Sequence, residues 1–133
     1  MPAPPLPDAV RELLAQPNPA VMATLRRSGQ PVTAATWYLL VDDRILVNLQ
    51  ADRVRVQHLR DDGRVALTVL AGGSWYTHVS LQGHVAELVD DTDLADVDRV
   101  ARQYTGEPYP ARDRKRVSAW IAIDHWTTWN LRD

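Results

Sequence analysis

The chain has 133 residues, enough for one domain with a single modest core, and its 45% hydrophobic and 24% charged residues are typical of a soluble globular protein. Its formal net charge of −2 argues against a general nucleic-acid or acidic-membrane binder, because both usually carry a clear positive excess. It has no cysteine, long apolar run or leader-like N-terminus, so we expect a cytoplasmic protein without disulfides, cysteine-ligated metals or a membrane partner.

The N-terminal part of the chain predicts a tail, one helix and three strands. Residues 1–7 contain four prolines and are expected to form a flexible tail of the single domain 1–133. A helix should begin at Asp8 and run to about Gln16, where the prolines at positions 17 and 19 end it. Hydrophobic residues then recur with a period of two, which predicts strands over Val21–Arg26, Pro31–Val41 and Arg44–Leu49.

A short basic helix follows and is the most informative segment of the sequence. We predict it between Asp52, the candidate N-cap, and Gly63, the candidate stop, with Arg53 and Arg55 in its first turns. The free N–H groups and positive dipole end of a helix N-terminus attract anions, and guanidinium groups strengthen that attraction. The segment therefore predicts an anion site. A solvated helix face, with the arginines paired to neighbouring aspartates, remains the alternative.

The C-terminal part predicts more strands around a second helix. Gly83 lies inside one of these strands and indicates a bulge or sharp bend. The helix should begin at Thr92 or Asp93 and end near Gly106. Many short strands with few short helices favour a mainly β domain, built as a small antiparallel barrel. The strands are predicted over Arg64–Leu70, Trp75–Leu88, Val117–Asp124 and Thr127–Leu131.

The other reactive residues match no catalytic or metal-binding pattern. The four histidines have neither paired nor HExxH spacing, so no metal site is expected. Ser80 and His78 share a strand face, but no nearby carboxylate completes a triad. No catalytic residue is identified from the sequence.

In their order and spacing, four segments resemble a known family. They are "VMATLRRSGQPVTAATWYLL", "DDRILVNLQADRVRVQHLRDDGRVALTVL", "YTHVSLQGHVAEL" and "ARQYTGEPYPARDRKRVSAWIAIDHWTTW". From Asp8 onward the chain resembles the split β-barrel flavin and deazaflavin oxidoreductases, the superfamily named after pyridoxamine 5′-phosphate oxidase. It is most similar to the short members that use coenzyme F420. The resemblance implies a six-stranded antiparallel split β-barrel of the FMN-binding type, and a homodimer with two cofactor sites between its subunits.

The resemblance also implies which residues bind the cofactor. The basic pair on the short helix matches the residues that clamp the cofactor phosphate, although Arg55 stands where lysine is common. The ring system is expected over the strand that contains Trp37, and His58 could also touch the cofactor. The implied cofactor-binding residues are Thr36, Trp37, Asn48, Leu49, Gln50, Arg53, Arg55, His58, Trp75 and Tyr76.

The function implied by the resemblance is F420-dependent reduction of a small unsaturated organic substrate, with FMN as the alternative cofactor. Hydride transfer requires the protein mainly to hold and orient the ring, so no nucleophile–base pair is needed. The basic cluster Arg112–Arg116 either forms an exposed loop, which we favour, or reaches the polyglutamate tail of F420. A non-catalytic cofactor carrier stays open as an alternative, as does a barrel that stacks single-stranded nucleic acid. The net charge of −2 speaks against the latter.

Overall fold

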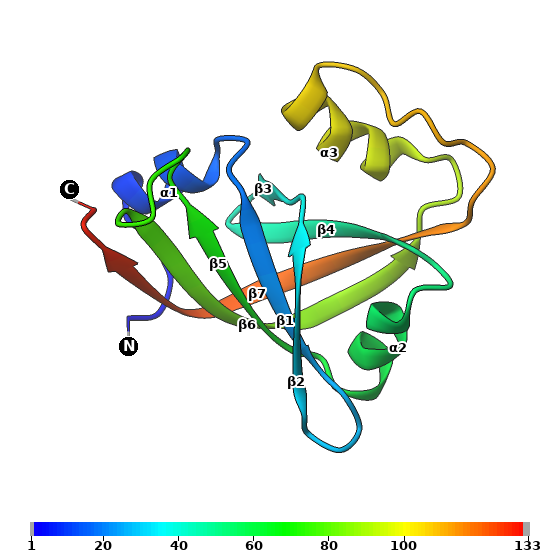
Figure 1. The fold of residues 1–133 in the computed structure, drawn as a ribbon, viewed down its shortest axis with the longest axis horizontal. Coiled ribbons are helices and arrows are strands. Elements are labelled where there is room, and N and C mark those ends of the chain that lie inside the picture. Colours follow the sequence, from blue (N-terminus) through cyan, green and yellow to red (C-terminus); the bar gives the residue numbers. More distant parts are fainter. Residues whose placement is uncertain (1, 132–133) are drawn as a thin grey trace.

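A single curved sheet forms the body of the molecule, with three helices around it (Figure 1). The computed structural model describes residues 2–131. The strands in this range are β1 (Ala20–Leu25), β2 (Pro31–Thr36), β3 (Leu39–Val41), β4 (Arg44–Gln50), β5 (Arg64–Leu70), β6 (His78–Asp90) and β7 (Arg116–Trp129), and the helices are α1 (Asp8–Leu14), α2 (Val54–Asp61) and α3 (Ala95–Thr105). The strands pair antiparallel in the order β2-β1-β5-β6-β7-β4-β3. The predicted mainly β antiparallel class is confirmed, with seven strands in the described range where six were expected.

The strand predicted over residues 31–41 is interrupted at Trp37 and Tyr38, and here the prediction was wrong. β2 and β3 are the two edge strands of the sheet, so the chain between them crosses from one edge to the other and closes the barrel covalently. The backbone of Tyr38 forms hydrogen bonds with two side chains of α3. Gln103 Nε2 donates to Tyr38 O at 3.1 Å, and Tyr38 N donates to Tyr104 Oη at 3.4 Å. A helix thus supplies hydrogen bonds that a neighbouring strand would otherwise make.

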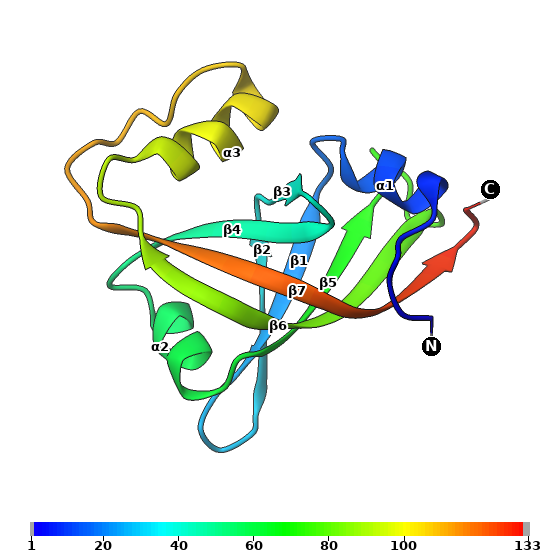
Figure 2. The ribbon, with the colours of Figure 1, turned by 180° about the vertical axis from the view of Figure 1, so that it is seen from behind.

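The last strand, β7, is continuous although two strands were predicted there. It lies between β6 and β4 over residues 116–122, and beyond them it pairs with β6 alone (Figure 2). Its polar segment around Asp124 and His125 resembles a turn in the sequence but belongs to the strand. The bulge predicted at Gly83 is confirmed by a register shift between Gln82 and Gly83. A Cβ at this glycine would collide with the carbonyl oxygen of Ala122, so the two strands approach this closely only without a side chain.

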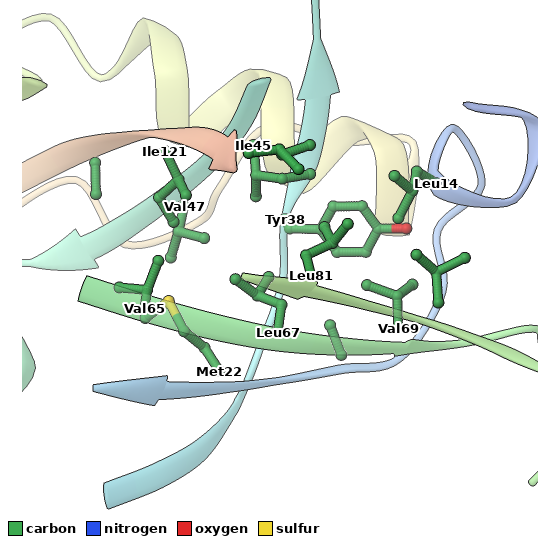
Figure 3. Packing of buried hydrophobic residues seen from close by; sticks show 14 of the residues in the cluster. Leu14, Met22, Tyr38, Ile45, Val47, Val65, Leu67, Val69, Leu81 and Ile121 are labelled. Atoms are coloured by element: carbon green, nitrogen blue, oxygen red, sulfur yellow. The ribbon is translucent and has the colours of Figure 1, made fainter. Parts of the chain in front are cut away.

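The core fills the inside of the barrel with aliphatic side chains and one tyrosine. Figure 3 shows Tyr38, which is fully buried, among these residues, and its hydroxyl donates to the carbonyl of Gln16 at 3.1 Å. β4 is buried on both faces. Ile45 packs inside the barrel, whereas Leu46 on the opposite face of β4 lies on the side that α3 covers with Val97 and other apolar residues. The helix α3 therefore shields the outer side of the barrel wall.

The ends of several elements differ from the sequence prediction. Leu6 is buried, and Trp126 N donates to Pro2 O at 3.0 Å, so the segment 2–7 is anchored at two points although residues 2–5 are exposed. Apolar packing of Leu6 outweighs the high proline content of this segment. Helix α2 has Arg53 as N-cap and Asp62 as C-cap, one residue away from the predicted caps at each end. Within the described range no helix is long and apolar enough to cross a membrane.

Candidate functional site

The start of α2 presents an N-terminus without a capping side chain. Arg53 is the N-cap residue, has an extended backbone and makes no side-chain cap bond within residues 2–131. Arg55 follows in the first turn, and no acidic residue lies in that turn. The positive end of the helix and two guanidinium groups therefore occupy the same part of the surface.

Arg55 carries a buried polar atom without a partner, as His78 and Trp126 also do within residues 2–131, but its group is the guanidinium. Its Nη1 atom is buried and has no hydrogen-bond partner among the described residues. Burial, followed by the neighbouring positive charge of Arg53, lowers the pKa of Arg55. A buried charge without a partner is costly, and a native structure tolerates it where a ligand of opposite charge binds. The geometry thus fits an anion at the start of α2.

The aspartates near this helix are already engaged with other residues. Asp52 accepts from Gln50 Nε2 at 2.7 Å. Asp61 pairs with Arg27 at 3.1 Å, and Asp62 pairs with the side chain of Arg64 at 2.8 Å. Neither Arg53 nor Arg55 takes part in an ion pair in the range 2–131. The alternative of a solvated helix face with internally paired arginines is therefore not what the structure contains.

Two of the predicted cofactor residues point into the barrel instead. Leu49 is buried on the inner face of β4. His58 is only 6% exposed, and its Nδ1 atom shares a hydrogen bond of 2.9 Å with Oγ1 of Thr24 on β1. The side chains of both residues lie beneath the helix surface that carries the arginines.

Asn48 belongs to a polar network between β4, β7 and α3. Its amide donates to Asp91 at 3.0 Å and to Ser118 at 3.1 Å, and its oxygen accepts from Arg116 Nε at 2.6 Å. The nearly buried Asp91 also accepts from the backbone N–H groups of Asp96 and Val97, and so caps α3. The sequence predicted a helix start at Thr92 or Asp93, whereas α3 begins at Ala95, whose N–H donates to Asp93 Oδ1 at 3.2 Å. The side chain of Asn48 is committed to this network.

An aromatic cluster surrounds Trp37 where the chain crosses between the sheet edges. Trp37 is 40% exposed and stacks on Tyr104 of α3, with ring centroids 5.0 Å apart and planes 6° from parallel. Tyr109 meets the same indole edge-on at 6.5 Å. An open hollow of about 490 Å³ lies beside Thr36, Trp37 and Tyr104. Sequence reasoning did not assign the two tyrosines, although both occur in the "ARQYTGEPYP" segment.

Trp75 and Tyr76 lie far from α2 in the same chain. They belong to the loop between β5 and β6, which is at the α1 end of the barrel, whereas α2 lies at the other end (Figures 1 and 2). Their side chains are 80% and 73% exposed. A single chain therefore does not bring all the predicted cofactor residues together.

The outer face of the sheet between these two ends carries two small side chains next to each other. Ala23 on β1 pairs with Ala66 on β5, and Ala66 pairs with Gln82 on β6. An open hollow of about 730 Å³ covers this row of residues. The small side chains make this part of the face shallow and accessible.

The second basic cluster, residues 112–116, has internal side-chain partners at its two ends. Arg112 pairs with Asp98 at 2.6 Å, and the Arg116 guanidinium lies 4.7 Å over the ring of Tyr109. Ala51 N, just before α2, donates to Lys115 O at 2.8 Å. Residues 112–115 are exposed and lie in the loop before β7, as expected, whereas Arg116 is half-buried and belongs to β7.

Comparisons with known proteins place the chain in a family. A family profile described as pyridoxamine 5′-phosphate oxidase matches residues 6–130. No curated protein sequence matches the chain significantly.

Many solved structures share the fold, including the following three. An F420 reductase is 22% identical with a TM-score of 0.83, and the match covers 92% of this chain and 98% of that one. A conserved hypothetical protein from Mycobacterium tuberculosis is 24% identical with a TM-score of 0.77, covering 96% and 86%. General stress protein 26 from Bacillus anthracis is 11% identical with a TM-score of 0.73, covering 94% of each chain. At sequence identities this low, these structures show only that the fold is shared.

Proposed function

This chain belongs to the pyridoxamine 5′-phosphate oxidase family, and on that premise we propose that it is an F420-dependent oxidoreductase. The proposed reaction is hydride transfer to a small unsaturated organic substrate. The cofactor would bind between the two subunits of a homodimer. The F420 reductase that shares the fold supports this choice of cofactor, and FMN is the alternative.

The observation that carries the proposal is the buried Nη1 atom of Arg55, which has no partner within residues 2–131. A phosphate group at the start of α2 would accept from this atom and from the free N–H groups of the helix. Arg53, exposed beside it, adds a second positive charge. The residues present therefore fit the phosphate that F420 and FMN have in common.

The deazaflavin supplies the hydride when it is bound, and the protein holds and orients it. Arg55 and Arg53 would fix the phosphate end. Thr36 and the half-exposed Trp37 lie on the side of the barrel where the ring system is proposed, and Trp37 is held in place by its stacking on Tyr104. Gln50 ends the strand that leads into α2 and is held by its bond to Asp52.

A second copy of the chain would complete the site. Trp75 and Tyr76 are exposed at the end of the barrel opposite α2, so they can serve a cofactor only on a partner subunit. The small side chains around Ala23 and Ala66 offer a face on which another sheet could pack closely. We propose that this face forms the dimer interface.

Titration with oxidised F420 and with FMN, followed by tryptophan fluorescence at two salt concentrations, tests the cofactor. Micromolar binding of F420 with little response to FMN is the expected result. Tight binding of FMN without binding of F420 would show that FMN, the alternative, is the cofactor. Binding of neither, together with salt-sensitive binding of an oligonucleotide, would overturn the proposal.

Light scattering on the wild type and on Ala66→Glu tests the dimer. We expect a dimeric wild type and a largely monomeric variant that binds the cofactor more weakly, because each monomer has only one wall of the site. Ala111→Glu, in an exposed loop, is the matched control and should remain dimeric. A monomeric wild type that binds F420 tightly would contradict a site between subunits.

A further inference from the structure

A buried polar pair joins α2 to the barrel directly beneath the arginines. Thr24 lies on the inner face of β1 and is fully buried, and His58 on α2 is almost fully buried. Thr24 Oγ1 and His58 Nδ1 are 2.9 Å apart. The bond connects two elements that are 34 residues apart in the sequence.

The other contacts of α2 with the barrel have less directional character. Val56 and Leu59 pack into the core, and such apolar contacts tolerate small rotations of a helix. Arg27 and Asp61 form a pair at the C-terminal end of α2, but Arg27 is mostly exposed and such pairs hold position weakly. The buried hydrogen bond has a narrow range of favourable distances and angles. It is therefore the contact that fixes how α2 is turned about its axis.

The rotation of α2 matters because His58 follows Arg55 by three residues. Residues three apart lie on neighbouring positions of one helix side, so the direction of His58 fixes the direction of Arg55. We propose that the His58–Thr24 hydrogen bond positions α2 so that the Arg55 guanidinium faces the anion. Thr24 and His58 are positioning residues in this proposal, which rests on the proposed function for the identity of that anion.

The test combines substitutions at Thr24 with one at Arg55. Thr24→Val removes the hydroxyl but keeps the branched shape, and Thr24→Ser keeps the hydroxyl. Each is made in the wild type and in Arg55→Gln. Affinity is measured by titration with oxidised F420 and, in a second series, with FMN. Thermal unfolding of every variant is recorded alongside, so that loss of fold is separated from loss of affinity.

We expect Thr24→Val to raise the Kd about tenfold and Thr24→Ser to change it by less than about threefold. In the Arg55→Gln background, Thr24→Val should cause no further loss of affinity, although it should still lower the unfolding temperature. Equal losses from Thr24→Val and Thr24→Ser would overturn the proposal. The proposal would also be overturned if Thr24→Val raised the Kd by the same factor in the Arg55→Gln background as in the wild type.

A second pair of variants covers the case in which Thr24→Val does not fold. His58→Asn keeps a polar δ atom at the position of Nδ1 and should retain the affinity, whereas His58→Leu should lose it. Equal affinities in these two variants would contradict the positioning role. An unchanged Kd in Arg55→Gln alone would remove Arg55 from the anion site and would overturn the positioning role with it, whereas the proposed function fails only if the wild type binds neither F420 nor FMN. A loss in Arg55→Gln without any loss in Thr24→Val would remove only the positioning role.

Discussion

The molecule has two clusters of arginines, which differ in whether the fold supplies partners for their side chains. At the start of α2, Arg53 and Arg55 have no ion-pair partner in the described part of the chain, and one nitrogen of Arg55 is buried without a hydrogen bond. In the second cluster, Arg112 is paired with Asp98, and Arg116, the first residue of β7, is bonded to Asn48. In the sequence, the second cluster is the denser of the two. Partners inside the fold, rather than the number of positive charges, separate a structural cluster from a candidate ligand site.

The first prediction contrasts one arginine from each cluster. Arg55→Ala should weaken F420 binding by about 1.5–3 kcal/mol, the range for a charged hydrogen bond to phosphate. Folding should be retained, because no internal partner among the described residues loses a bond. Arg112→Ala, the control, should leave the affinity unchanged. Fluorescence titration measures both, and equal losses would erase the distinction between the clusters.

The second prediction concerns the polar network at the base of α3. Asp91→Ala should lower the free energy of unfolding by about 2 kcal/mol, because it removes the helix cap and leaves the amide of Asn48 short of an acceptor. Urea denaturation measures the change. Asp90→Ala, at the exposed neighbouring position, is the control and should have a small effect. A free energy of unfolding for Asp91→Ala equal to that of the wild type would show that the network is dispensable.

The third prediction is a pH dependence of the paired cluster. The hydrogen bond from Arg112, together with that from the Tyr109 backbone, holds the pKa of Asp98 below its usual range. A carboxylate with a lower pKa in the folded state stabilises the fold above the unfolded pKa of about 3.9, and this contribution is lost as the pH falls through the folded value. Wild type should therefore lose more stability than Arg112→Ala between pH 6 and about 3. Urea denaturation at each pH measures this, and an equal fall in the free energy of unfolding of both proteins would contradict it.

The smallest effect is expected for the two exposed basic residues of the second cluster. Replacing Arg114 and Lys115 together by alanine should change the free energy of unfolding by less than about 0.5 kcal/mol. The F420 affinity should fall only slightly, and less at high salt, if these residues do no more than attract the anionic cofactor from a distance. A loss as large as that of Arg55→Ala would instead support direct contact with the polyglutamate tail.

Local sequence patterns were sufficient for the parts of the molecule that local forces decide. The period of two identified the strands on both sides of α2, and Gly83 marked the bulge because a glycine inside a strand has few other roles. The segment with Arg53 and Arg55 was correctly identified as a helix start.

Contacts between distant segments decided the rest. The break at Trp37 and Tyr38 is accompanied by hydrogen bonds of the Tyr38 backbone with Gln103 and Tyr104, which are more than 60 residues away in the sequence. The lack of a partner for Arg55 depends on where the aspartates pair, and Asp61 pairs with Arg27 on the β1–β2 turn. No pattern in the neighbourhood of these residues carries that information. This is why the helix could be predicted, but not the buried nitrogen that makes it a candidate site.

The position of β7 in the sheet has a consequence for how the protein is made. β7 is the last of the described strands to be synthesised, yet it alone joins β4 to β6. Until its residues have left the ribosome, the nascent chain holds two separate groups of strands with exposed edges, and such edges invite aggregation. The sheet can be completed only after β7 has been synthesised. Slow synthesis of β7 would therefore prolong the interval in which these strand edges are exposed.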